Sequence, residues 1–282
     1  MIKIESLQNE KIKKIIRLRK PSERHEAGLI VVEGKKEIEM ALAGGWEIQE
    51  FYFCPEFDRF NGGRASGCPL SGVGEEKMIE VSREVFQKMS YRDTPDGFLA
   101  VFKNLKNQEL NNLKIVKNKT NGRRANVCPP SQTALIIILE SVEKPGNLGA
   151  ILRTADAVGV DAVIINDSQT DIFNPNVIRA SRGTIFTVPV AIAGVKETQE
   201  WLKKNKIKSF AATDKARKDY TKINFKKSCA IVLGSEDKGL SEEWLEASDE
   251  QVKISMSGKI DSLNVSVAGA VMAFEARRQR SC

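Results

Sequence analysis

Apolar runs alternate with segments of helical periodicity along most of the chain. In the N-terminal part, apolar runs predict four strands, at residues 29–32, 48–53, 78–81 and 98–102. Amphipathic segments predict three helices, at residues 6–20, 35–43 and 82–89. Pro21 is expected to stop the first helix, and Ser82 is expected to cap the third. Together these elements predict a compact α/β unit.

The C-terminal half repeats the alternation with more strongly apolar strands. Residues 134–139 form a continuous apolar run, which is typical of a strand buried on both faces of a parallel sheet. Further strands are predicted at residues 160–165, 185–188, 209–212, 230–233 and 251–254. Helices are predicted at residues 147–159, after a Pro-Gly turn, at 174–183 and 195–205, and after a cap at Ser262. This order predicts a parallel sheet covered by helices.

Two stretches lack this periodicity. Residues 55–74 are rich in Gly, Asn and Pro and are expected to form a loop. Residues 103–133 gain Asn, Lys and Arg and have too little apolar surface to fold alone, which is typical of a linker or a basic arm. We therefore expect an N-terminal domain at residues 1–103, a basic linker at 104–133 and a C-terminal domain at 134–282.

Two loops that follow predicted strands carry the candidate ligand site. One is the glycine-acid turn from Gly234 to Gly239, and the other is the polar loop that leads to Ser262. In a parallel sheet both loops open at the carboxyl edge of the strands, where ligands bind. The alternative is that the glycines are ordinary turn residues and that Ser262 is an ordinary N-cap. The small residues 268–270 leave one side of the last helix thin, so another element is expected to approach it closely.

Composition and charge narrow the class of protein. The chain has 282 residues, of which 41% are hydrophobic. It contains neither a long apolar span nor a signal-peptide core, so we expect a soluble cytoplasmic protein that is not associated with a membrane. Five cysteines without a CxxC pair argue against disulfides and a zinc site. The net charge of +7 is clustered at residues 103–124 and 196–227, which favours RNA as the partner, although a lysine run is often only a solvated face. Arg179 and Arg182 are candidates for phosphate contacts.

Several catalytic classes are excluded by what the sequence lacks. His25 is the single histidine, which rules out a Ser-His-Asp hydrolase and a multi-histidine metal site, and it is left with a surface role or an RNA contact. Neither GxGxxG nor GxxxxGK[ST] occurs, so the usual dinucleotide-binding and P-loop interpretations have no support.

Three segments carry a resemblance to a known family. They are PGNLGAILRTA at residues 145–155, IVLGSEDKGL at 231–240 and ISMSGKIDSLNVSVA at 254–268. In this order they resemble the three motifs of the SpoU (TrmH-type) RNA 2′-O-ribose methyltransferases of the SPOUT superfamily. The N-terminal part resembles, more loosely, the substrate-binding domain that these enzymes often carry, whose fold is similar to that of a small ribosomal protein.

The resemblance implies an α/β fold with a C-terminal trefoil knot, an S-adenosylmethionine site formed by the knotted loops, and a homodimer. Backbone groups of the knotted loops are expected to hold the cofactor. The cofactor residues implied are Thr213, Gly234, Ile254, Met256 and Leu263. The catalytic residues implied are Asn147, Arg153, Glu236, Ser262 and Asn264.

The implied reaction is the attack of a ribose 2′-hydroxyl on a sulfonium methyl, which requires alignment and removal of a proton. Arg153 is a poor base, because a guanidinium almost never loses its proton, so we expect it to anchor the adjacent phosphate and stabilise the developing alkoxide. Asn147 would orient Arg153 or the phosphate, and Glu236 would hold Arg153 or a backbone turn, with capping of that turn as an equal alternative. Ser262 and Asn264 would fix the cofactor loop and the ribose.

The sequence is compatible with four functions. The leading hypothesis is ribose methylation of ribosomal RNA, with the large subunit favoured; the others are a tRNA substrate, a non-catalytic RNA-binding factor for ribosome assembly, and base methylation, which has no well-placed acid to support it. One position departs from the family pattern, because Ser255 stands where the family usually has proline. This replacement is expected to leave the loop freer and to add a hydrogen-bond donor.

Overall fold

A computed structural model describes residues 2–57, 73–104, 108–113 and 133–280 of the chain. The loop expected at residues 55–74 and the basic linker at 104–133 lie mostly outside these residues. By backbone proximity the chain divides into two compact units. The first comprises Met1–Lys106 and Asp171–Thr187, and the second comprises Asn107–Thr170 and Val188–Cys282.

The first unit is built on a mixed five-stranded sheet with the order β1-β4-β3-β5-β2. Its strands are β1 (Ile2–Ile4), β2 (Leu29–Glu33), β3 (Ile48–Phe53), β4 (Met78–Val81) and β5 (Phe98–Lys103). β5 runs antiparallel to both β2 and β3, and β4 runs parallel to both β1 and β3. The α-helices are α1 (Glu10–Arg17), α2 (Pro21–Ala27), α3 (Lys35–Ala43), α4 (Arg83–Met89) and α6 (Pro175–Ala180). Short 3₁₀ turns lie at Pro55–Phe57, Glu75–Lys77 and Thr184–Phe186.

Aromatic side chains explain why Asp171–Thr187 belongs to the first unit. Trp46 donates its indole N–H to the carbonyl of Phe186 at 3.1 Å, and its ring meets Phe173 and Phe186 edge to face. Phe102 of β5 stacks on Phe186 at a centroid distance of 6.4 Å. A Cβ at Gly44 would lie 2.2 Å from the Phe186 carbonyl oxygen, so glycine is required for this approach. Buried aromatic area therefore fixes the segment to the N-terminal sheet.

The second unit contains a seven-stranded sheet with the order β10-β12-β9-β11-β6-β7-β8, and every paired strand in it is parallel. Its strands are β6 (Leu135–Glu140), β7 (Ala162–Asn166), β8 (Val190–Ala193), β9 (Lys208–Ala212), β10 (Lys218–Asp219), β11 (Cys229–Leu233) and β12 (Glu250–Lys253). All of β6 is buried, as its continuous apolar sequence predicted. The mixed α/β class with a parallel sheet is therefore confirmed, and the knot stays a prediction.

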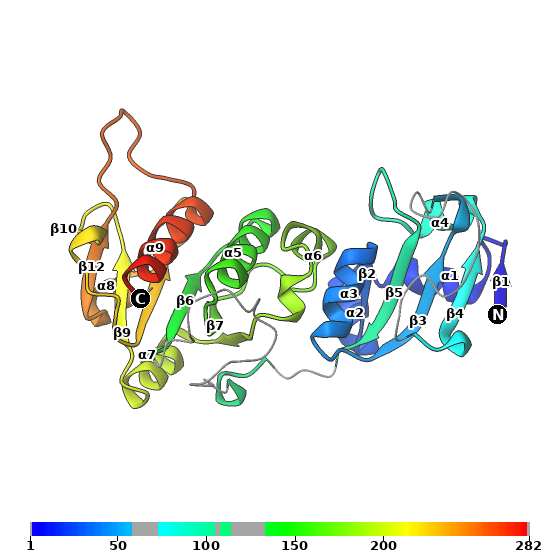
Figure 1. Ribbon diagram of the computed structural model, residues 1–282, viewed down its shortest axis with the longest axis horizontal. Helices are drawn as coiled ribbons and strands as arrows, with labels where there is room; N and C mark the ends of the chain where they lie inside the picture. The colour runs from blue at the N-terminus through cyan, green and yellow to red at the C-terminus, as the bar shows by residue number, and fades with distance from the viewer. Residues whose placement is uncertain (1, 58–72, 105–107, 114–132, 281–282) are drawn as a thin grey trace. The chain divides into compact units, whose positions relative to one another are not determined.

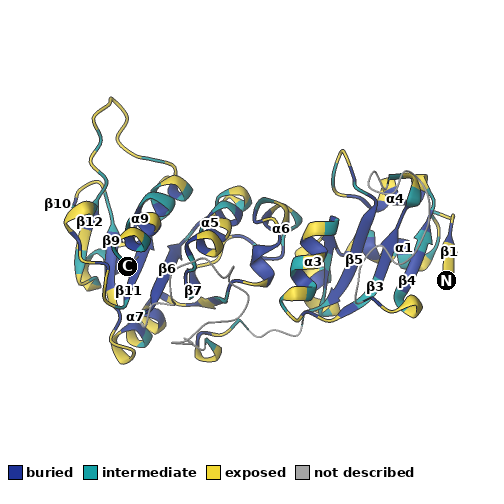
Figure 2. Cartoon of the chain, viewed as in Figure 1, coloured by how far each residue is buried: buried dark blue, intermediate teal, exposed yellow. Residues whose placement is uncertain are grey.

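Helices cover both faces of this sheet. They are α5 (Pro145–Val158), α7 (Val195–Lys204), α8 (Glu242–Ala247) and α9 (Val265–Arg280), with 3₁₀ turns at Leu110–Asn112 and Tyr220–Lys222. α5 and α9 lie side by side, and α9 packs on β11 (Figure 1). A Cβ at Gly269 of α9 would lie 2.8 Å from the Leu233 side chain, which confirms that another element approaches the thin side of this helix closely. Figure 2 shows the central strands β6, β7 and β11 as buried and the outer helix faces as exposed.

Three local predictions were wrong, and one helix was not predicted. Pro145 is the first residue of α5 rather than part of a preceding turn, because proline fits the first helical position, where no N–H is needed. The first helix ends before Pro21, as predicted, but Pro21 also begins the unpredicted helix α2. The strand expected at residues 185–188 is a 3₁₀ turn, and β8 follows it at Val190. The cap of α9 is Asn264 rather than Ser262, since the Asn264 side chain accepts the Ser266 N–H at 2.9 Å.

Among the residues that the structure describes, no helix combines the length and the apolar character needed to cross a bilayer.

Candidate active site

A cluster of polar side chains joins the three segments that carry the family resemblance. Asn147 lies in the first turn of α5, Glu236 in the turn after β11, and Asn264 directly before α9. The amide of Asn147 donates to one carboxylate oxygen of Glu236, and the amide of Asn264 donates to the same oxygen at 2.8 Å. The Asn264 amide also donates to the Asn147 carbonyl oxygen at 3.2 Å. The structure therefore brings three of the five predicted catalytic residues into mutual contact.

Two neighbours that the sequence interpretation missed hold this cluster in place. Lys144, just before α5, donates its ammonium to the second carboxylate oxygen of Glu236. Ser266 donates its hydroxyl at 2.6 Å and its backbone N–H at 2.9 Å to the Asn264 side-chain oxygen. Because that oxygen is occupied by donors, the Asn264 amide nitrogen must face Glu236 and Asn147. The sequence contained a signal for each of these two contacts. Lys144 directly precedes the Pro-Gly-Asn motif, and Ser266 lies two residues after Asn264.

Glu236 is an ionised anchor in this arrangement. The hydrogen bond from Lys144 lowers the pKa of Glu236 below its ordinary value, with Asn147 adding to the effect and burial opposing it. The same contact raises the pKa of Lys144. A carboxylate with a lowered pKa is a weaker proton acceptor, so Glu236 is suited to positioning the two amides rather than to removing a proton. A pocket lined by Lys144, Asn147, Ser235, Glu236 and Val265 lies around these groups.

The other predicted catalytic residues lie outside this hydrogen-bonded cluster. The Arg153 side chain is exposed on α5 and makes no hydrogen bond or ion pair with any residue that the structure describes. Ser262 is exposed in the loop between β12 and α9 and likewise has no side-chain hydrogen bond within the described chain. Glu236 contacts Lys144, Asn147 and Asn264 rather than Arg153.

The predicted cofactor residues follow neighbouring strands of the parallel sheet. Thr213 comes directly after β9, Gly234 after β11 and Ile254 after β12, and these three strands are adjacent in the order β12-β9-β11. Met256 and Leu263 lie in the loop between β12 and α9. Because all three strands run in the same direction, their carboxyl ends share one edge of the sheet. Exposed backbone groups at such an edge are available to a ligand.

Gly234 is required by the turn that it begins. A Cβ at this position would lie 2.2 Å from the backbone of Gly239, where Ser235 and Gly239 exchange two backbone hydrogen bonds. Gly239 has a φ of 69°, which is a left-handed conformation that suits glycine. Glycine at position 234 therefore allows the two ends of the turn to approach each other closely at the sheet edge.

Ser255 anchors the loop that follows β12. Its hydroxyl donates to the Asp219 carboxylate at 2.6 Å and its N–H donates at 3.3 Å, which confirms the predicted extra hydrogen bond. Hydrogen bonds from Ser255 and Thr221 hold the pKa of Asp219 well below its ordinary value. Asp219 ends β10, which pairs with β12. The loop is therefore tied to the sheet by a polar contact at the position where the family usually has proline.

Family models match both parts of the chain. One described as the SpoU rRNA Methylase family matches residues 134–274, half of the chain, and one described as an MRM3-like substrate binding domain matches residues 9–100. The chain belongs to the SpoU rRNA methylase family. The family assignment made from the three sequence motifs is thereby confirmed.

Several SpoU relatives match over nearly the whole chain. An uncharacterized tRNA/rRNA methyltransferase of Synechocystis is 30% identical over 98% of this chain and 94% of its own length. The 23S rRNA (guanosine(2553)-2′-O)-methyltransferase RlmP of Bacillus subtilis is 26% identical over 98% of this chain and 100% of its own. An AdoMet-bound rRNA methyltransferase from Sinorhizobium meliloti is 27% identical, with a TM-score of 0.80 over 98% of this chain and 97% of its own. A crystal structure of an RNA 2′-O ribose methyltransferase is 33% identical, with a TM-score of 0.76 over 99% of both chains.

Proposed function

We propose that this SpoU family member methylates a ribose 2′-hydroxyl in structured ribosomal RNA and uses S-adenosylmethionine as the methyl donor. The observation that carries the proposal is the contact among Asn147, Glu236 and Asn264, which joins all three family motifs at one edge of the parallel sheet. Relatives that match nearly the whole chain are named as 2′-O-methyltransferases, and one solved relative holds AdoMet.

The residues at the sheet edge fit this cofactor. The backbone at Gly234, together with the strand ends at Thr213 and Ile254, would hold the donor mainly through main-chain groups. Met256 and Leu263 would contact it from the loop that Ser255 ties to Asp219. When bound, S-adenosylmethionine supplies an electrophilic methyl group. A C-terminal trefoil knot, in which the tail threads through its own domain, would shape this pocket.

The polar side chains would then position the ribose. Arg153 is exposed and without a countercharge among the described residues, so it is free to pair with the phosphate next to the target nucleotide and to stabilise the developing alkoxide. Asn147 and Asn264, oriented by the ionised Glu236, would hold the ribose and the loop. Ser262 would support the loop. The proton leaves through water or a neighbouring group, because neither Arg153 nor the low-pKa Glu236 is a good acceptor.

The different parts of the chain would have different roles, in line with the two family matches. Residues 1–103 would read the shape of the RNA, the basic segment 104–133 would add phosphate contacts, and residues 134–282 would carry methyl transfer. With such a substrate, the protein would act in the cytoplasm.

A homodimer is part of the proposal. Val267 and Phe274 of α9 are seven residues apart, so they lie on one helix face, and they are 47% and 53% exposed. Large exposed apolar side chains on a helix beside α5 are suited to an interface with a second copy. Sedimentation of the wild type beside a Val267→Glu, Phe274→Glu variant tests this; a monomeric wild type would refute it.

Mapping ribose methylation in RNA from cells with and without the protein tests the function. We expect one ribosomal nucleotide to lose its 2′-O-methyl group in the absence of the protein and to regain it in vitro with purified protein, cofactor and the unmodified RNA. A lost site in tRNA would favour the tRNA alternative. Calorimetry separates the enzyme from a non-catalytic RNA-binding factor, because only the enzyme is expected to bind S-adenosylmethionine.

A further inference from the structure

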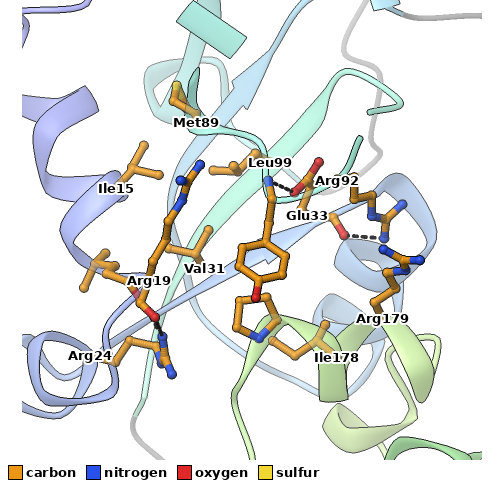
Figure 3. Close-up of a pocket in the computed structure, with 13 residues that line it drawn as sticks. Ile15, Arg19, Arg24, Val31, Glu33, Met89, Arg92, Leu99, Ile178 and Arg179 are labelled. Atoms are coloured by element: carbon orange, nitrogen blue, oxygen red, sulfur yellow. Dashed lines mark hydrogen bonds between the residues drawn. The ribbon is translucent and has the colours of Figure 1, made fainter. Parts of the chain in front are cut away.

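A second pocket lies in the first unit, and none of its lining residues belongs to the three sequence motifs. Elements of both the N-terminal sheet and Asp171–Thr187 line it: Val31 and Leu99 form part of an apolar floor, Tyr91 follows α4, and Ile178 and Arg179 belong to α6. The enclosed part of the cavity is small, about 30 Å³, and it opens to solvent, so a ligand would sit largely at its mouth. Figure 3 shows Arg19 and Arg179 on opposite sides of this hollow.

Tyr91 is held at both ends while its ring stays accessible. Its backbone N–H donates to the Glu33 carboxylate at 2.7 Å, and its phenol oxygen accepts from the Asn176 amide at 3.3 Å. The residue is nevertheless 44% exposed. Glu33 also accepts the Ser90 hydroxyl at 2.5 Å, so both of its oxygens fix the 90–91 turn. A fixed, half-exposed aromatic ring above an apolar floor is suited to stacking with a planar base.

The arginines around the pocket differ in whether their charge is already neutralised. Arg24 is buried against Asp171, and Arg92 pairs with Glu37 at 3.1 Å. Arg19 instead donates to two backbone carbonyls, those of Lys88 and Ser90, each at 2.8 Å, which neutralises no charge.

The Arg179 side chain is exposed and has no hydrogen bond or ion pair with any residue that the structure describes. Two positive charges therefore face the hollow without a carboxylate partner, and they favour an anionic ligand.

We propose that this pocket binds one unpaired nucleotide of the RNA substrate, outside the methylated position, and the proposal rests on the function proposed above. The base would stack on Tyr91 over the apolar floor, and the flanking phosphates would pair with Arg19 and Arg179. An aromatic ring, an apolar floor and uncompensated arginines are the groups with which proteins bind splayed single-stranded bases. The family match of residues 9–100 to a substrate binding domain includes Tyr91. Arg179 lies in the methylase match, so the pocket combines both matched regions.

Four single variants of the full chain test the pocket. Tyr91→Leu keeps an apolar side chain but removes the ring, and Tyr91→Phe keeps the ring but loses the bond to Asn176. Arg179→Ala removes one uncompensated charge. Lys36→Ala removes an exposed charge of the same unit that does not line the pocket, which makes it the matched control. Thermal unfolding establishes that each variant is folded.

Binding and turnover are measured with large-subunit ribosomal RNA from cells that lack the protein. We expect Tyr91→Leu and Arg179→Ala each to raise the KM for RNA about tenfold, with kcat at saturating RNA and the Kd for S-adenosylmethionine unchanged. Arg179→Ala is expected to lower the slope of log affinity against log salt by about one. Tyr91→Phe and Lys36→Ala are expected to stay within about twofold of the wild type. Photocrosslinking with 4-thiouridine-labelled RNA is expected to mark the peptide that contains Tyr91.

Unchanged RNA affinity in both Tyr91→Leu and Arg179→Ala would overturn the pocket proposal, and so would RNA crosslinks that never fall on the peptide containing Tyr91. The function proposed above can fail separately. Loss of RNA binding in Tyr91→Leu, in a protein that methylates no RNA, would refute the enzyme and support the pocket.

Discussion

Replacing Glu236 with glutamine tests whether the hydrogen-bonded cluster positions the substrate. Glutamine has nearly the same shape, but it keeps one acceptor oxygen and presents an amide in place of the other. In the wild type one oxygen receives the Lys144 ammonium and the other receives the amides of Asn147 and Asn264. The NH₂ group of a glutamine would therefore face either Lys144 or the two asparagine amides, which are all donors. The hydrogen bonds on that side of the cluster would be lost.

The magnitude follows from the contacts that are lost. A hydrogen bond to a charged group contributes about 1.5–3 kcal/mol, but the Glu236 side chain is 22% exposed and solvent weakens the contact. The exposed pair with Lys144 adds little. We therefore expect a loss of about 1–2 kcal/mol, which corresponds to about a 5- to 30-fold fall in kcat/KM for RNA. The same loss would lower the Tm by about 2–6 °C.

The assay is methyl transfer to unmodified ribosomal RNA, with cofactor affinity measured by calorimetry. Because the Glu236 side chain contacts Asn147 and Asn264 rather than the backbone of Gly234, the Kd for S-adenosylmethionine should change less than about threefold. Asp237→Asn is the matched control, since this neighbouring carboxylate makes no side-chain hydrogen bond within the described chain. Wild-type kcat/KM in Glu236→Gln, or an equal loss in Asp237→Asn, would refute the reasoning.

The pH dependence of this cluster has a definite sign. The folded-state pKa of Glu236 lies below the ordinary value of 4.5, so its contribution to stability is fully present above that value. It is lost as the pH falls through the lower folded-state pKa. The stability difference between the wild type and Glu236→Gln, followed by urea unfolding, should therefore shrink only in acid.

Four further substitutions give separate expectations. Arg153→Ala should abolish methyl transfer and leave the Kd for S-adenosylmethionine within about threefold; equal loss of both, by activity assay and calorimetry, would defeat its assignment to the ribose. Gly234→Ala should weaken cofactor binding by more than about tenfold, because the added Cβ lies 2.2 Å from the Gly239 backbone, and a normal Kd would show that the turn is not part of the site. Ser255→Ala should raise the KM for the cofactor about threefold through loss of the 2.6 Å bond to Asp219, whereas an unchanged KM would mean that this bond does not order the loop. Arg280→Ala should lower the free energy of unfolding, measured by urea titration, by about 2–3 kcal/mol. The Arg280 guanidinium donates to the backbone carbonyls of Phe225, Thr133, Ala134 and Lys227, and these hydrogen bonds would be lost. A loss below about 0.5 kcal/mol would contradict this expectation.

Local sequence determined most of the elements and their chemistry. Three elements have the predicted bounds: the helix at Lys35–Ala43 and the strands at Ile48–Phe53 and Met78–Val81. Their bounds could be predicted because hydrophobic periodicity and flanking glycines determine backbone conformation within a few residues. The parallel sheet followed from the doubly buried run at β6, and the three motifs in order were enough for the family. The requirement for glycine at position 234 was likewise visible as part of a turn motif.

Tertiary structure decided which distant groups meet. Asn147 and Glu236 are 89 residues apart, and only the adjacency of β11 and β6 brings the loops that carry them together. The segment Asp171–Thr187 joins the first unit because Trp46 and Phe102 bury its aromatic rings. The hydrophobic periodicity of the segment does not indicate these packing partners. The pocket beside Tyr91 arises from that packing. Periodicity specifies which face of an element is buried, whereas the partner of that face depends on strand order and on side-chain fit across the whole chain.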